Sequence, residues 1–235
     1  MFHNYYHLPV FRSLRSIARK MKILNILKKI VGNNASYEEP FHEALKKSIK
    51  IGDIVWDVGA NVGFYTNLFL DWVGKEGKVI AFEPMPTTFF ALDKSLGTST
   101  NIMLVQKALS ENAGVSYFSA SRENDVTAHL VEKENNETLK VEVTTADLIT
   151  KNDSTLQPNV IKIDVEGFEE DVLKGGMITF SNKKCRHILV EMHFTRMDER
   201  NLKDSPNRIV KMLKNWGYKV KWVDASHIHA IRKNS

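Results

Sequence analysis

The sequence has few cysteines and no long apolar run. Cys185 is the single cysteine in 235 residues, which excludes an internal disulfide framework and is typical of a reducing compartment. No apolar stretch reaches the roughly 18 residues of a transmembrane helix. The first 30 residues lack the apolar core and the cleavage site of a secretory signal peptide. These absences predict a cytoplasmic protein.

Acidic residues are missing from residues 1–37, which hold seven of the 33 basic residues of a chain with net charge +5. The rest of the chain is therefore close to neutral, which argues against a nucleic-acid partner. Residues 12–31 predict a basic amphipathic helix, which would either contact a membrane surface or pack on the protein body or a second subunit. We thus expect a basic arm at 1–35 and one domain at 36–235, in an oligomeric state that the sequence leaves open.

A predicted strand, turn and helix organise the chain. Ile54–Val58 is apolar except for Asp57, as is typical of a parallel strand buried on both faces. Gly59 and Gly63 bracket a turn and permit a positive φ and the close approach of a ligand. Apolar side chains then recur at helical spacing: Phe64, Leu68 and Trp72. This pattern predicts the first βα unit of a doubly wound α/β fold, with its ligand at the carboxyl end of the strand.

The turn differs from the dinucleotide-binding pattern G-x-G-x-x-G, because Asn61 occupies the position of the middle glycine. Asp57 precedes the turn, and a carboxylate there repels phosphate and suits a cationic ligand. Glu83 ends the next predicted strand, about 20 residues after the turn, where an acid commonly holds ribose hydroxyls. A cationic ligand with a ribose and no pyrophosphate points to S-adenosylmethionine. The predicted cofactor-binding residues are Asp57, Gly59, Asn61, Gly63 and Glu83.

Further polar side chains follow two later predicted strands. Asp164 ends the strand that starts at Val160 and Glu166 begins the predicted helix after it, while Glu191 and His193 lie at the end of the strand that starts at His187. Parallel strands place their carboxyl ends at one sheet edge, so these side chains should lie near the turn.

We expect this group to bind an acceptor hydroxyl and to remove its proton. His193 is the predicted general base, because an unperturbed imidazole is partly neutral at pH 7. Asp164 is predicted to contact the sulfonium end of the cofactor or the hydroxyl, with Glu191 as a further catalytic residue. Glu166 and His193 are the predicted substrate-binding residues.

Other interpretations of these residues remain open. Glu191 and His193 could bond only to each other or to nearby loop backbone. Asp164, Glu191 and His193 are also suitable metal ligands, but their spacing matches no recognised ligand signature, so we predict no metal. The pair His227-x-His229 is interpreted as a surface or turn feature.

Five segments in order resemble the FkbM family of S-adenosylmethionine-dependent methyltransferases. They are residues 57–66, 82–84, 108–110, 162–169 and 190–193, of which Lys-Ile-Asp-Val-Glu-Gly-Phe-Glu at 162–169 is the most specific. The resemblance implies a class I methyltransferase fold, which is Rossmann-like and doubly wound, with a mostly parallel seven-stranded sheet and one antiparallel strand. It also implies that the turn residues and Glu83 bind the cofactor and that Asp164 lies beside the methyl group.

We therefore predict an O-methyltransferase that acts on a hydroxyl of a sugar, a glycan or a related metabolite. A nicotinamide-dependent oxidoreductase is one alternative, which Asn61 argues against. A non-catalytic Rossmann-like scaffold or membrane-docking protein is another, which Glu83, Asp164 and His193 argue against. The polar stretch 121–138 is expected to be a loop over the ligand side.

Overall fold

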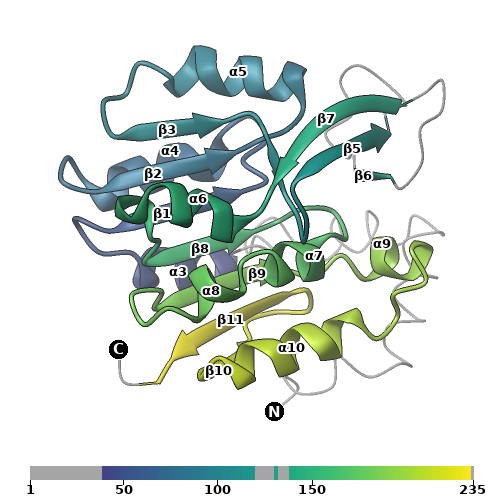
Figure 1. Cartoon of the computed structure of the whole chain (residues 1–235). Coiled ribbons are helices and arrows are strands. Elements are labelled where there is room, and N and C mark those ends of the chain that lie inside the picture. The colour runs from purple at the N-terminus through teal and green to yellow at the C-terminus, as the bar shows by residue number, and fades with distance from the viewer. Residues whose placement is uncertain (1–38, 120–129, 132–137, 234–235) are drawn as a thin grey trace, which may run out of the picture.

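The computed structural model describes residues 39–119, 130–131 and 138–233 (Figure 1). The basic arm at 1–35, its predicted helix at 12–31 and most of the loop at 121–138 lie outside these residues. Within the described ranges, no helix has both the length and the apolar character needed to cross a membrane.

A seven-stranded sheet forms the centre of the molecule, in the order β10-β11-β9-β8-β1-β2-β3. Its strands are β1 (Ile54–Val58), β2 (Lys78–Phe82), β3 (Ile102–Val105), β8 (Val160–Ile163), β9 (His187–Glu191), β10 (Tyr218–Trp222) and β11 (His227–Arg232). Only β11 runs antiparallel to its neighbours among these seven strands. The predicted mostly parallel sheet with one antiparallel strand is confirmed.

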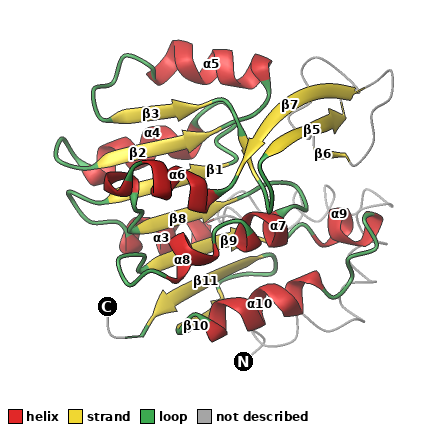
Figure 2. Ribbon diagram, in the orientation of Figure 1, coloured by secondary structure: helices red, strands yellow, loops and turns green. Residues whose placement is uncertain are grey.

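Helices cover both faces of this sheet (Figure 2), as its apolar central strands require. On one face are α3 (Glu39–Ser48), α4 (Phe64–Val73) and α5 (Pro86–Leu96), and on the other α6 (Ala146–Asn152), α7 (Glu169–Lys174), α8 (Met177–Ser181) and α10 (Ser205–Asn215). Within β1, Val55 packs toward α3 and α4, while Trp56 packs into the core on the opposite face. Alternation along one strand therefore builds two cores.

A smaller sheet lies beside the carboxyl ends of the central strands (Figure 1). It contains β4 (Ala108–Leu109), β5 (Gly114–Ser119), β6 (Leu130–Val131) and β7 (Thr138–Thr144) in the order β4-β7-β5-β6. Strand β6 falls inside the stretch 121–138, so part of the predicted loop is a short strand paired with β5. The helix α9 (Phe194–Glu199) follows β9 near the same edge.

The interpretation of His227 and His229 as surface or turn residues is wrong. Both belong to β11 and are buried, with exposed fractions of 1% and 5%. Residues two apart on a strand face the same side, and here α3 covers that side: the Phe41 ring stacks on His227, and Ser48 Oγ lies 3.2 Å from His229 Nε2.

Candidate active site

The first βα turn is shaped by its contact with a second turn after β8. Gly59 has φ +82°, and a Cβ atom there would lie 1.9 Å from the main-chain oxygen of Asp164. Asn61 also has a positive φ, at 52°, which asparagine tolerates better than most residues. Gly59 is thus required by the approach of two protein segments, and this approach brings the predicted cofactor turn against Asp164.

Glu83 closes the same turn from the end of β2. Its buried carboxylate accepts hydrogen bonds from the Asn61 N–H at 2.8 Å, the Met85 N–H at 2.9 Å and the Thr88 hydroxyl at 2.8 Å. Burial raises the pKa of Glu83. A carboxylate offers about four acceptor sites, so these three contacts leave capacity for one ribose hydroxyl.

Asp57 is directed into the protein. It is fully buried, its Oδ2 accepts from the Thr66 hydroxyl at 2.7 Å, and its Oδ1 lies 3.1 Å from Lys162 Nζ. Lys162 is its register partner on β8, and its ammonium also lies 3.4 Å from Asp164. In the structure Asp57 therefore holds Lys162, and its contact with the cofactor stays a prediction.

Lys162 is a site residue that the sequence analysis missed. Burial alone would lower its pKa, but the carboxylates of Asp57 and Asp164 outweigh burial and raise it, so the ammonium stays charged. The available signal was a lysine inside an otherwise apolar buried strand, two residues before Asp164. Its partner Asp57 could not be identified, because the pairing of β1 with β8 joins residues 105 positions apart.

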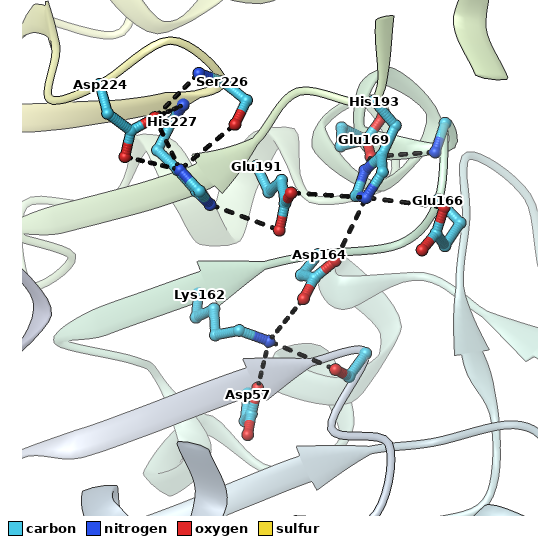
Figure 3. A network of polar contacts seen from close by, with 12 residues as sticks. Asp57, Lys162, Asp164, Glu166, Glu169, Glu191, His193, Asp224, Ser226 and His227 are labelled. Atoms are coloured by element: carbon cyan, nitrogen blue, oxygen red, sulfur yellow. Dashed lines mark hydrogen bonds and ion pairs between the residues drawn. The ribbon is translucent and has the colours of Figure 1, made fainter. Parts of the chain in front are cut away.

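The four polar residues predicted at the second site come together, with three carboxylates around the imidazole of the fourth, His193 (Figure 3). His193 Nε2 lies 3.6 Å from Asp164 Oδ1, 3.6 Å from Glu166 Oε2 and 3.8 Å from Glu191 Oε1. Glu166 reaches this position from a turn in which its own φ is 50°. The predicted clustering at the sheet edge is therefore what the fold produces.

A second missed residue, Glu169, holds His193 from the other side. Glu169 is fully buried at the start of α7, and its Oε1 accepts a hydrogen bond from His193 Nδ1 at 2.6 Å. Burial alone would lower the pKa of His193, but this bond and the surrounding carboxylates raise it to about 10. The imidazole is thus cationic at neutral pH, and it could serve as a base only after losing that proton.

Glu191 makes its own contact away from the cluster. Its Oε2 lies 3.3 Å from Nε2 of His227, its register partner on β11, and His227 Nδ1 lies 2.8 Å from Asp224 Oδ2. Burial opposes the charge of His227, yet the two carboxylates raise its pKa to about 9. Glu191 and His193 therefore do not form a simple mutual pair, because each has a separate buried partner.

Comparison with known proteins agrees with this geometry. A family model described as the methyltransferase FkbM domain matches residues 57–220, which include both turns, Glu83 and the His193 cluster. Hexuronic acid methyltransferase AglP of Haloferax volcanii is 32% identical over 145 residues, or 60% of this chain and 56% of that protein. The chain thus spans about half the length of this relative.

Two solved structures share the fold. The FkbM methyltransferase of Methylobacillus flagellatus superposes with a TM-score of 0.51 at 18% identity, over 76% of this chain and 43% of that one. An S-adenosylmethionine-dependent O-methyltransferase of Thermotoga maritima gives 0.50 at 12% identity, over 91% and 71% of the two chains. Both confirm the predicted class I methyltransferase fold.

The predicted cofactor agrees with the family. S-adenosylmethionine is the usual methyl donor of FkbM methyltransferases, and the first turn suits it, since Glu83 retains acceptor capacity beside a tight turn. The family model covers more than half of the sequence. The chain therefore belongs to the FkbM methyltransferase family.

Proposed function

We propose that this protein transfers a methyl group from S-adenosylmethionine to a hydroxyl of a sugar, a glycan or a related metabolite. The observation that carries the proposal is the contact of two turns: Gly59 packs on the main chain of Asp164, so the Glu83 side of the site adjoins the His193 cluster. The family match supports methyl transfer, and the hexuronic acid methyltransferase among its relatives supports a sugar acceptor.

The reaction is an in-line displacement at the sulfonium methyl group. The acceptor oxygen loses its proton and forms the new O–C bond as the C–S bond breaks, and S-adenosylhomocysteine leaves as a neutral thioether. Alignment of two bound reactants can supply about 7–11 kcal/mol in favourable cases. Removal of the acceptor proton by a positioned base raises the rate by about 10²–10⁴-fold.

The proposal assigns each site residue a role. Gly59, Asn61, Gly63 and Glu83 bind the cofactor, with Asp57 supporting the turn through Lys162. Asp164 lies between the cofactor turn around Glu83 and the His193 cluster. It contacts the methyl-bearing end of the cofactor or the acceptor hydroxyl. Glu191 and His193 are catalytic, and Glu166 joins His193 in holding the acceptor.

The proposal is tested with methyl-labelled S-adenosylmethionine and a panel of sugars that contains hexuronic acids and matched neutral hexoses, free and in glycans. We expect label on at least one sugar hydroxyl, in a linkage stable to mild base, which a methyl ester would not survive. S-adenosylhomocysteine should raise the melting temperature and NAD should not. Stabilisation by NAD alone would favour an oxidoreductase, and stabilisation by neither would favour a scaffold.

The basic arm at residues 1–35 is proposed as a segment separate from the domain at 36–235, with peripheral membrane contact as its role. Its seven basic residues without an acid support attraction to anionic lipid. Flotation with anionic liposomes should recover the full chain and not a chain that lacks residues 1–35. Equal recovery of both would refute the membrane contact.

A further inference from the structure

The centre of the His193 cluster is arranged for something other than a hydrogen bond. A hydrogen bond between a ring nitrogen and a carboxylate oxygen joins the two atoms at about 2.7–3.2 Å. All three facing carboxylates, of Asp164, Glu166 and Glu191, instead lie 3.6–3.8 Å away (Figure 3). The nitrogen therefore lies near three carboxylate oxygens without a hydrogen bond to any of them.

The spacing of these atoms suits a bound cation. One ligand atom each from Asp164, Glu191 and His193 lies within 4.8 Å of the other two. A divalent cation about 2.0–2.6 Å from each donor needs donors roughly 3–5 Å apart. The three side chains keep exposed fractions of 14% to 30%, so a cation in solvent can reach them.

Each of the three donors is oriented by a partner that uses its other polar atom. Asp164 Oδ2 faces Lys162 at 3.4 Å, Glu191 Oε2 faces His227 at 3.3 Å, and His193 Nδ1 donates to Glu169 at 2.6 Å. A carboxylate on the far nitrogen of a metal-binding histidine fixes the tautomer that offers the near nitrogen to the metal. The outer contacts of a metal site are thus already formed.

Glu169 is the buried carboxylate behind His193. Its Oε1 accepts from His193 Nδ1 at 2.6 Å and from the Gly167 N–H at 3.0 Å, whereas among the described residues its Oε2 has no hydrogen-bond partner. A buried charge is costly unless it is compensated, and this one depends on the His193 ring. A dication on the opposite side of the His193 ring would polarise the imidazole and compensate Glu169 through it.

We propose that Asp164, Glu191 and His193 bind a divalent cation, Mg²⁺ or Mn²⁺, with Glu166 beside the open coordination positions. Oxygen donors favour hard cations, and one imidazole among them suits Mn²⁺ in particular. The prediction of no metal rested on sequence spacing, which reveals nothing here because the donors come from two strands that only the fold brings together.

The role of the cation rests on the proposed methyl transfer. An acceptor hydroxyl that coordinates the cation becomes more acidic and is held in place for attack on the methyl group. Its proton leaves to Glu166 or to water, the oxygen lone pair attacks the methyl carbon, and the C–S electrons stay on sulfur. His193 then acts as a ligand, and the acceptor proton leaves without passing through its ring.

Cation binding is tested on the full chain, freed of metal with a chelator and titrated with Mn²⁺ while free Mn²⁺ is followed by electron paramagnetic resonance. We expect one site per chain. His193→Ala and Glu191→Gln should abolish that site, and Glu169→Gln should weaken it about 10–100-fold. Glu43→Gln, at an exposed carboxylate on α3 paired with Lys47, is the matched control and should bind like the unaltered chain.

The titration needs neither cofactor nor acceptor, so it can fail independently of the proposed function. Circular dichroism of each variant shows whether it is folded, and Glu191→Gln conserves shape if His193→Ala does not fold. The cation site is overturned if the unaltered chain binds no Mn²⁺. It is also overturned if folded His193→Ala and Glu191→Gln bind Mn²⁺ as tightly as the unaltered chain does. Retained Mn²⁺ binding without any methyl transfer would instead count against the proposed function alone.

Discussion

The site has two halves, the cofactor turn around Glu83 and the His193 cluster, and they differ in how their charges are compensated. Around Glu83 three donors already bond to the carboxylate, so this half is formed before any ligand arrives. Around His193 four carboxylates crowd one imidazole, and three of them are too far away for a hydrogen bond. The difference indicates that the first half recognises a ligand by shape and one remaining acceptor, whereas the second half leaves three carboxylates near one ring nitrogen without hydrogen bonds to it.

Lys162 links the two halves, and its loss should have the largest effect. Lys162→Met keeps the length of the side chain but leaves Asp57 charged, fully buried and without its ammonium partner. Removing one member of a buried ion pair costs about 3–5 kcal/mol, so we expect that decrease in the free energy of unfolding in urea. The double variant Asp57→Asn/Lys162→Met should recover part of the loss. If the free energy of unfolding decreases by less than about 1 kcal/mol, this buried pair contributes no more than an exposed ion pair does.

Gly59 tests whether the contact of the two turns is rigid. Gly59→Ala meets both a positive φ, which costs about 1–2 kcal/mol, and the main-chain oxygen of Asp164, where overpacking adds about 1–3 kcal/mol. Gly52→Ala is the matched control, because Gly52 has φ +84° and no atom near its added Cβ. Urea unfolding should show a clearly larger loss for Gly59→Ala. Equal losses would mean that the contact adapts freely.

Glu83 tests the half that is already formed. Glu83→Ala should weaken binding of S-adenosylhomocysteine by calorimetry by about 1.5–3 kcal/mol, the usual worth of a hydrogen bond to a charged group. Glu76→Ala, at an exposed acid before β2, should bind normally. Glu191→Gln should also keep its affinity if the two halves recognise different molecules. Unchanged affinity in Glu83→Ala would remove Glu83 from the cofactor site.

The smallest expected effect concerns a histidine pair away from both halves. His187 Nδ1 lies 3.0 Å from His229 Nε2, and burial lowers the pKa of His187 to about 4 and that of His229 to about 3. Both rings stay neutral in the folded chain, while the unfolded chain binds protons below about pH 6.5. Stability should therefore fall as pH drops from about 6.5 toward 4.

The variant His229→Gln should flatten that part of the pH profile in urea titrations, because it removes one of the two groups that gain a proton on unfolding. The matched variant His42→Gln, on the half-buried side of α3, leaves the buried pair intact and should keep the slope. An unchanged slope in His229→Gln would show that this ring is already protonated in the folded chain. The His187–His229 pair would then carry a proton in the folded chain, as His193 does.

Local sequence determined the elements of this protein. The apolar run Ile54–Val58 and the glycine turn at Gly59 predicted the strand and the turn correctly, because each depends on neighbouring residues. The helix after the turn was also found, but its buried face is Thr66, Phe69 and Val73. The apolar residues Phe64, Leu68 and Trp72 do not form that face, because this helix is apolar around much of its circumference.

Tertiary structure decided the partners. Strand pairing sets Lys162 opposite Asp57 and His227 opposite Glu191, and the start of α7 places Glu169 on His193. These pairings join residues that are 24 to 105 positions apart, and no local pattern encodes them. The sequence alone thus determined which residues end each strand, whereas the fold decided which charges meet, since the energy of a buried charge depends on the groups around it in space.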